Sequence, residues 1–323
     1  SSDLFPLINW NENFGSAAIF MAALEASGET VATNESESVH SIDFNFINYA
    51  LASFAPYVGE AFGDVHKNVQ VIKTLQNLAI EAGIREGEYK VVFLFEDTKP
   101  CSVEAVYLKL YALSQAKVPL RGICLDGAFG VLPNVAWSGS TPIELEWLRE
   151  NEIELKLSGS YPDITSVDKF PRFLQHIIPQ DNTRILEASK VRMGAQLAAG
   201  TTVMPGASYI NFNAGTTGAV MVEGRISSSA IVGKGSDVGG GASILGVLSG
   251  TNGNPVSIGE NTLLGANSVC GIPLGDGCII DAGLSILEGT KVHINEAAVK
   301  MIQAVNSGLV ISEDGYYKGL TLA

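Results

Sequence analysis

The chain has 323 residues and a formal charge of −14, from 34 acidic and 20 basic side chains. That charge disfavours broad binding to nucleic acid or to an anionic membrane, because both need a basic surface. The apolar share of 46% excludes general disorder, and no apolar run approaches the roughly 20 residues that span a bilayer. The four cysteines form no Cys-x-x-Cys pair, which predicts reduced thiols and a cytoplasmic protein.

The first half of the chain predicts a mixed α/β domain, which we place at residues 1–165. In chain order, the pattern predicts helices at 16–27 and 65–82, a short buried strand at 90–95, a helix at 103–116, and strand with turn at 120–135. A helix at 165–178 is expected to lie in a connecting segment at 166–182, which leads into a region of different composition.

Composition changes sharply near residue 184. Residues 185–290 hold 21 of the 35 glycines but only two aromatic residues, Tyr209 and Phe212. Such a stretch lacks the bulky residues of an ordinary core, yet it keeps regularly spaced aliphatics that a flexible linker does not have. It therefore predicts an ordered structure with its own repeat.

The aliphatic residues of this region recur every six positions. The four blocks in register are Ile185, Val191, Leu197 and Val203; Ile226, Val232, Val238 and Ile244; Ile258, Leu264 and Cys270; and Leu274, Ile280, Ile286 and Val292. A period of six fits a hexapeptide solenoid, in which each unit forms one face of a coil and places one aliphatic on the axis. We therefore predict a mainly β protein with a parallel β-helix at residues 183–293.

The intervals that break the period run from Val203 to Ile226, from Ile244 to Ile258, and from Cys270 to Leu274. A solenoid absorbs such changes as loops that leave a corner. The second interval contains the turn formers at 249–255, which predict a mobile loop able to act as a lid. A C-terminal segment at 294–323 follows, with a helix at 294–305 that covers the last coil.

Catalytic side chains are scarce in the repeat. Its lack of histidines argues against a zinc site or an internal histidine base, although His293 lies at its far end. Glu223 lies at the first break in the period and has two open interpretations. It is either a solvated corner carboxylate or a displaced one that accepts a proton from an amine or attacks an acyl group. Arg225 and Arg192 are surface cations or anchors for an anionic substrate.

Several ordered motifs closely resemble the tetrahydrodipicolinate N-succinyltransferase family of lysine and diaminopimelate biosynthesis. They are Asn-Phe-Asn-Ala-Gly at 211–215, Met-Val-Glu-Gly-Arg-Ile-Ser at 221–227, Gly-Ser-Asp-Val-Gly-Gly-Gly-Ala-Ser at 235–243, Leu-Gly-Ala-Asn at 264–267, and Gly-Ile-Pro-Leu-Gly-Asp at 271–276. The resemblance covers about residues 117–289 and is weaker before them.

The resemblance implies a left-handed β-helix and a homotrimer with active sites between subunits. It also implies transfer of succinyl from succinyl-CoA to the amino group of ring-opened tetrahydrodipicolinate, with no permanently bound cofactor. Glu223 matches the family's catalytic glutamate, and Gly246 matches the glycine whose amide polarises the thioester carbonyl. The positions that match the lining of the succinyl-CoA groove are Arg225, Gly240, Ser243, Ala266, Asp281, Ala282 and Gly289.

Three departures from the family pattern affect these expectations. Asp281 stands where the family carries Glu. Some relatives bind a divalent ion on the trimer axis through acidic residues, but the matching stretches at 189–190 and 204–207 contain no carboxylate, so we predict no metal. Relatives also carry an Asn-Ser-x-Ser-Gly-like motif that helps close the site, and this chain stops before one appears, which leaves truncation at either end open.

Two alternatives to the succinyltransferase hypothesis stay open. One keeps the fold and uses acetyl-CoA as the donor, because the sequence does not show the depth of the acyl pocket. The other is a non-catalytic β-helical scaffold for binding or assembly, which would not be stabilised by CoA. The hypothesis for Glu223 likewise leaves general-base and acyl-anhydride roles open.

Overall fold

The computed structural model describes residues 5, 7–9, 14–60, 66–83, 87–247, 251, 253–291, 310–311 and 317–318. The chain divides into two compact units, Ser1–Pro171 and Arg172–Ala323. This division falls inside the connecting segment expected at residues 166–182. None of the helices in the described part of the chain is long and apolar enough to cross a membrane.

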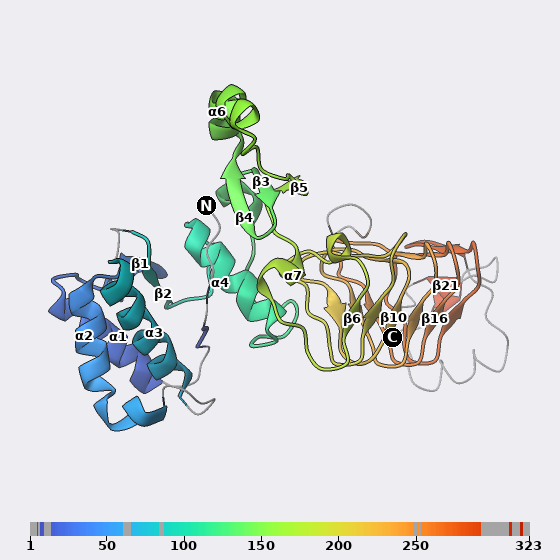
Figure 1. Cartoon of the computed structure of the whole chain (residues 1–323). Coiled ribbons are helices and arrows are strands. Elements are labelled where there is room, and N and C mark those ends of the chain that lie inside the picture. Colours follow the sequence, from blue (N-terminus) through green and yellow to red (C-terminus); the bar gives the residue numbers. More distant parts are fainter. Residues whose placement is uncertain are drawn as a thin grey trace. The chain divides into compact units, whose positions relative to one another are not determined.

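The first unit begins with helices that share a core with a two-stranded antiparallel sheet (Figure 1). The elements are α1 (Phe14–Ala26), β1 (Glu37–Ser41), α2 (Phe44–Ser53), the 3-10 helix η1 (Ala55–Glu60), α3 (Lys67–Ala82) and β2 (Lys90–Leu94). The Asp43 carboxylate caps α2 by accepting the Phe46 N–H at 2.7 Å. Leu24, Phe46 and Ile72 are buried in the common core. The helices predicted at 16–27 and 65–82 are confirmed, whereas β2 is only partly buried.

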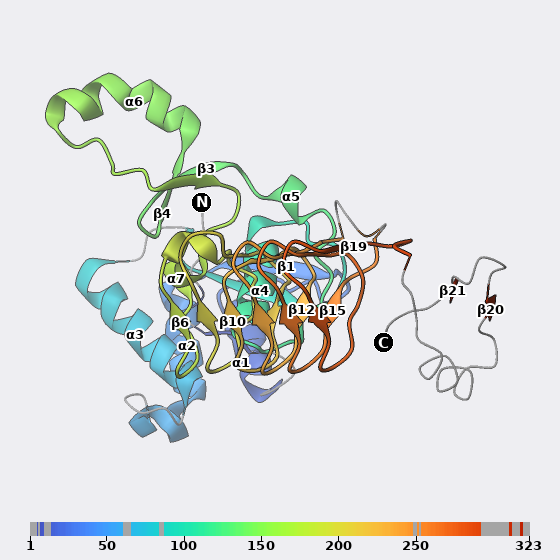
Figure 2. The ribbon, with the colours of Figure 1, turned by 90° about the vertical axis from the view of Figure 1, so that its right-hand side faces the viewer.

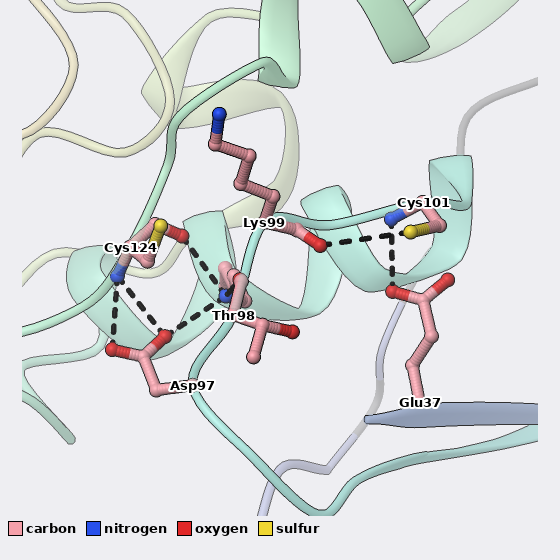
Figure 3. A network of polar contacts seen from close by, with 7 residues as sticks. Glu37, Asp97, Thr98, Lys99, Cys101 and Cys124 are labelled. Carbon is pink, nitrogen blue, oxygen red and sulfur yellow. Dashed lines mark hydrogen bonds and ion pairs between the residues drawn. The ribbon is translucent and has the colours of Figure 1, made fainter. Parts of the chain in front are cut away.

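Helix α4 (Val103–Ser114) confirms the helix predicted at 103–116 and carries a buried lysine. Lys109 is 1% exposed. Its Nζ donates to Asp97 Oδ1 at 2.9 Å and to the carbonyl oxygens of Thr98 and Cys124. The Asp97 carboxylate also accepts the Cys124 N–H at 3.0 Å (Figure 3). An ammonium group is tolerated inside a protein only where acceptors replace water, so this network ties two loops to α4.

The first unit ends with a three-stranded sheet in the order β4-β3-β5, in which both pairings are antiparallel. The elements here are α5 (Ala128–Val131), β3 (Val135–Ser138), β4 (Thr141–Glu144), α6 (Leu145–Ser158) and β5 (Ser166–Asp168). Of the strand with turn expected at 120–135, the turns are confirmed at 120–121 and 126–127. The strand is wrong except for its last residue, because the one-turn helix α5 forms there instead.

The connecting helix expected at 165–178 is also wrong. Its first residues form β5, which pairs with β3, and only the single turn α7 (Phe173–His176) is helical. Pro171 lies between them. Its ring disfavours a helical conformation for Phe170, and its nitrogen has no proton to donate. Pairing with β3 therefore determines the structure before the proline.

The second unit is a parallel β-solenoid whose two-residue strands stack into three sheets (Figures 1 and 2). The first sheet contains β6 (Arg184–Ile185), β7 (Thr202–Val203), β10 (Met221–Val222), β13 (Asp237–Val238), β16 (Leu263–Leu264) and β18 (Ile279–Ile280). The second contains β8 (Tyr209–Ile210), β11 (Arg225–Ile226), β14 (Ser243–Ile244), β17 (Val269–Cys270) and β19 (Ser285–Ile286). The third contains β9 (Gly215–Thr216), β12 (Ile231–Val232) and β15 (Ser257–Ile258). The 3-10 helix η2 (Ala188–Lys190) lies in the first coil.

The second residue of each strand faces the axis of the solenoid. Val222, Ile226, Val232 and Ile244 are all fully buried, and they stack on the equivalent residues of the coils before and after them. The period of six is thus confirmed, with one inward-facing residue on each face of a coil. These residues stack into buried aliphatic columns, which form the interior of the solenoid. Val292, the last member of the fourth block, lies outside the described residues.

The breaks in the period map to particular corners. Between Val203 and Ile226, one corner is longer by a residue, because Ile210 follows Val203 by seven positions. Another corner is two residues shorter than a regular corner of the repeat, because only Glu223 and Gly224 separate β10 from β11. The insertion after Ile244 contains the expected lid at 249–255, of which residues 249, 250 and 252 lie outside the described residues.

The C-terminal segment is described only at β20 (Val310–Ile311) and β21 (Tyr317–Lys318), which pair antiparallel. The helix predicted at 294–305 lies outside the described residues. The α/β unit followed by a parallel β-solenoid is confirmed, and the left-handed sense of the coil stays a prediction from the resemblance.

Candidate functional site

The corner at Glu223 is built by its neighbouring glycine. A Cβ on Gly224 would lie 2.3 Å from the Ala242 carbonyl oxygen, in the coil stacked on this corner. Glycine therefore allows the chain to turn in only two residues. The Glu223 N–H donates to the Val238 carbonyl at 2.8 Å, and its carbonyl accepts the Gly241 N–H at 3.2 Å. The backbone of the carboxylate-bearing residue is thus held from the next coil.

Corresponding corner residues of later coils stack above Glu223. We call this column, which consists of Glu223, Gly240, Ala266, Asp281 and Ala282, the first edge. The Asn267 N–H donates to the Gly240 carbonyl at 2.9 Å, and the Gly283 N–H donates to the Ala266 carbonyl at 2.8 Å. These bonds run from coil to coil along the first edge. The structure thus brings five of the predicted site residues together along one side of the solenoid.

Two further predicted residues border the first edge. Arg225 and Ser243 are paired neighbours in the second sheet, and the Arg225 Nε donates to the Ser243 Oγ at 3.1 Å. Ser243 is buried, whereas Arg225 is exposed. The serine therefore fixes the inner end of the guanidinium group. Its remaining N–H groups can face an anionic ligand.

The Glu223 carboxylate is partly buried and lies beside a glycine. A Cβ on Gly240 would be 3.7 Å from Glu223 Oε2, so the missing side chain leaves that face of the carboxylate open. In the described part of the chain, no side-chain or backbone group hydrogen-bonds to this carboxylate. The Asp281 carboxylate, at the far end of the edge, accepts the N–H of Ala282 at 3.1 Å.

The remaining predicted residues lie on a different corner, where the chain leaves the second sheet. We call Arg192, Gly246 and Gly289 the second edge. A Cβ on Gly246 would lie 2.9 Å from Ser227 Cβ, so glycine is required there. The Gly246 N–H has no partner among the described residues. Arg192 Nη1 donates to Asn211 Oδ1 at 3.2 Å. Within one chain, the second sheet separates the two edges, so Glu223 and Gly246 are not brought together.

Sequence reasoning missed two residues that shape the first edge. Gly224 was noted only as part of a motif, although its lack of a side chain permits the short corner. Asn267 adopts a positive φ of 56°, and its Oδ1 would be 2.3 Å from a Cβ on Gly241. An asparagine in a motif next to a corner glycine is a sequence signal for this left-handed turn.

Among the described residues, no group of three or more His, Cys, Asp or Glu side chains could hold a metal ion. The prediction that this chain binds no metal stays a prediction. Near the stretch that we compared with metal-binding relatives, the Glu187 carboxylate accepts the Ser189 hydroxyl at 2.5 Å and lies 3.6 Å from Lys190 Nζ. His293 lies outside the described residues.

Comparison with known proteins covers both units. Family models match residues 2–130 (tetrahydrodipicolinate N-succinyltransferase N-terminal), 132–172 (tetrahydrodipicolinate N-succinyltransferase middle) and 255–288 (hexapeptide repeat of succinyl-transferase). The chain is 66% identical over 319 residues to the 2,3,4,5-tetrahydropyridine-2,6-dicarboxylate N-succinyltransferase of Sulfurimonas denitrificans, with 99% of this chain and 80% of the relative covered. Identity to the enzyme of the same name from Sulfurovum sp. is 68% over 315 residues, with 98% and 78% covered.

A solved structure agrees. The crystal structure of a putative 2,3,4,5-tetrahydropyridine-2-carboxylate N-succinyltransferase from Campylobacter jejuni matches with a TM-score of 0.89 at 58% identity, covering 99% of this chain and 81% of that one. The similarity is therefore not confined to residues 117–289 but includes the first unit. The chain belongs to the tetrahydrodipicolinate N-succinyltransferase family.

Proposed function

We propose that this protein transfers the succinyl group of succinyl-CoA to the amino group of ring-opened tetrahydrodipicolinate. The products are N-succinyl-2-amino-6-oxopimelate and CoA, within lysine and diaminopimelate biosynthesis. The single observation that supports this most is the 66–68% identity to two N-succinyltransferases over nearly the whole chain. A cytoplasmic location is part of the proposal and rests on the free cysteines of the structure.

Glu223 is the group that we assign to proton transfer. The amine attacks the thioester carbonyl, the new C–N bond forms, the C–S bond breaks, and the amine proton passes to the carboxylate. The open side of the carboxylate above Gly240 leaves room for the amine. The alternative, in which Glu223 itself attacks the acyl group and forms an anhydride, uses the same open side. The Gly246 N–H would donate to the carbonyl oxygen as negative charge develops on it.

The separation of the two edges supports an active site between subunits. Glu223 and Gly246 flank opposite sides of the second sheet, so one chain cannot place both on the same thioester. In the homotrimer that we propose, the first edge of one subunit faces the second edge of the next. Arg225 beside the first edge and Arg192 on the second edge would each supply a cation to the anionic substrates, which the overall charge of −14 otherwise disfavours.

Exchange of Glu223 tests the proposal. Glu223→Gln keeps the size of the side chain but removes the base, and we expect kcat to fall at least about 100-fold. The assay follows CoA thiol release from succinyl-CoA in the presence of tetrahydrodipicolinate. Glu260→Gln is the matched control, because Glu260 is an exposed corner glutamate of the same solenoid between the third and first sheets.

Three outcomes would contradict parts of the proposal. Unchanged thiol release in Glu223→Gln would remove Glu223 from the chemistry. A higher kcat/KM with acetyl-CoA than with succinyl-CoA would favour the acetyltransferase alternative. A scaffold without catalysis predicts no thiol release from either donor and no rise in melting temperature with CoA.

A further inference from the structure

Three polar side chains that the proposed reaction does not use meet at strand β1 in the first unit. Ser38 Oγ lies 2.5 Å from His40 Nε2, and His40 Nδ1 lies 3.2 Å from Glu29 Oε2. Ser38 is 9% exposed and His40 is 8% exposed. A hydroxyl, an imidazole and a carboxylate in this order form the arrangement by which a histidine activates a serine nucleophile.

Local structure holds each member of this set in place. Ser38 and His40 are two positions apart on β1, so their side chains leave the same face of the strand. Both are fixed by pairing with β2, opposite Phe93 and Val91. Glu29 follows the end of α1, where its N–H donates to the Leu24 carbonyl at 3.0 Å. A capped helix end therefore supplies the carboxylate and a paired strand supplies the other two groups.

The order of the three groups is compatible with the proton arrangement of an activated serine. An ionised carboxylate only accepts hydrogen bonds, so the proton on His40 Nδ1 points to Glu29. In the neutral ring the other nitrogen, Nε2, is then an acceptor. With the Glu29 carboxylate ionised and the His40 ring neutral, the hydroxyl proton of Ser38 points toward His40 Nε2, which is the orientation that general-base activation requires.

Ser38 and His40 line a cavity of about 590 Å³ that is open to solvent. This volume is within the usual range for small-molecule sites. Cys101 and Glu37 also line it, and the Cys101 N–H donates to Glu37 Oε2 at 3.0 Å, which ties the segment before α4 to β1 (Figure 3). Glu35 is a second carboxylate in the wall. Two carboxylates disfavour an anionic acyl group, so the cavity fits a neutral one.

We propose that Ser38 is a nucleophile that is acylated by small, neutral, activated carboxylic esters. The Ser38 Oγ attacks the carbonyl carbon, a C–O bond forms, and the hydroxyl proton passes to His40 Nε2. The bond between the carbonyl carbon and the leaving oxygen breaks, and the leaving group takes this proton. Water then cleaves the acyl-serine by the same proton path, which releases the carboxylic acid and regenerates the serine.

A fluorophosphonate probe tests this with the full chain. The probe forms a P–O bond to an activated serine and loses fluoride, and the product is read by intact mass and peptide mapping. We expect one added group per chain, on Ser38. We also expect hydrolysis of p-nitrophenyl acetate, which falls at least about 100-fold in Ser38→Ala and His40→Gln.

Matched variants separate this site from other nucleophiles and from misfolding. Ser41→Ala changes an exposed serine of the same strand and should keep the wild-type rate. Cys101→Ser removes the thiol of the cavity, and the label should still be found on Ser38. Glu29→Gln changes a side chain that is 51% exposed, so it keeps the fold and should still slow labelling.

Absence of label on Ser38 in wild-type protein would overturn the proposal, as would labelling that is equally fast in His40→Gln or Glu29→Gln. Either result would make the three side chains a buried polar contact that only satisfies hydrogen bonds. The label is read as mass on Ser38, so its outcome does not depend on succinyl transfer and the two proposals can fail separately.

Discussion

The two units of this chain obtain their buried interiors in different ways. In the solenoid, each coil repeats the same short strands, and the inward residue of one coil stacks on its equivalent in the next. In the first unit, the core joins helices and strands far apart in the chain, such as Leu24, Phe46 and Ile72. The residues inside a repeat structure can be recognised in the sequence from their regular spacing. The residues of a core built from different helices and strands cannot be identified until the fold is known. The expected effects of substitution differ accordingly.

The largest effect on stability is expected in the first unit, where a single network holds a buried charge. Asp97→Ala leaves the Lys109 ammonium group without its carboxylate, which should cost about 3–5 kcal/mol in the free energy of unfolding. Urea unfolding measures this cost, and hydrogen exchange should show the loss of protection in residues 97–124. Glu152→Ala is the control, because Glu152 forms an exposed pair with Lys156 one helical turn away. A cost no greater than that of the control would show that Lys109 is not buried as described.

A core substitution in the solenoid should have the next largest effect. Ile244 is fully buried, so Ile244→Ala should cost about 2–5 kcal/mol through lost contacts and a cavity. Ile279 is the outward residue of its strand and is 73% exposed, so Ile279→Ala should change stability by less than about 0.5 kcal/mol. Thermal or urea unfolding at equal chain concentration compares the two. Equal losses would contradict the assignment of inward and outward positions.

The smallest expected effect concerns the start of the solenoid unit. Burial lowers the pKa of His176, in helix α7, from its ordinary value of 6.5. The unfolded chain therefore binds more protons than the folded chain below pH 6.5, and stability should fall as the pH decreases through that range. The melting temperature at pH 7.5 and at pH 5.5 measures the slope, and His176→Gln should make it shallower. An unchanged slope would assign the pH dependence to other groups.

In the solenoid, the spacing of the sequence identified one candidate catalytic residue but not the arrangement around it. Glu223 stood out because the period breaks there, and the structure places it at a two-residue corner. The glycine that permits this corner and the stacking of the first edge could not be inferred without knowing which coils are neighbours. The split between Glu223 and Gly246 was equally hidden, since motif order does not show that a sheet lies between them.

In the first unit, several helices predicted from local spacing were confirmed. The predicted helix at 165–178 was wrong because part of this segment pairs with a strand from elsewhere in the chain. Residues 165–178 have helical spacing, yet β5 completes a sheet with β3 and Pro171 ends any helix. Ser38 and His40 are visibly two positions apart in the sequence. The contact of His40 with Glu29, in line with its contact to Ser38, depends on where α1 ends and how β1 is packed.

For this protein, spacing along the chain was enough to establish a solenoid, the inward position of each strand and the unusual corner at Glu223. These features follow from local repetition, because every coil meets a near copy of itself at a constant separation. Folding in three dimensions was needed to reveal the two edges, the buried Lys109 and the contact among Ser38, His40 and Glu29. Each of these joins segments that have no common period, and their proximity arises from packing that no local pattern encodes.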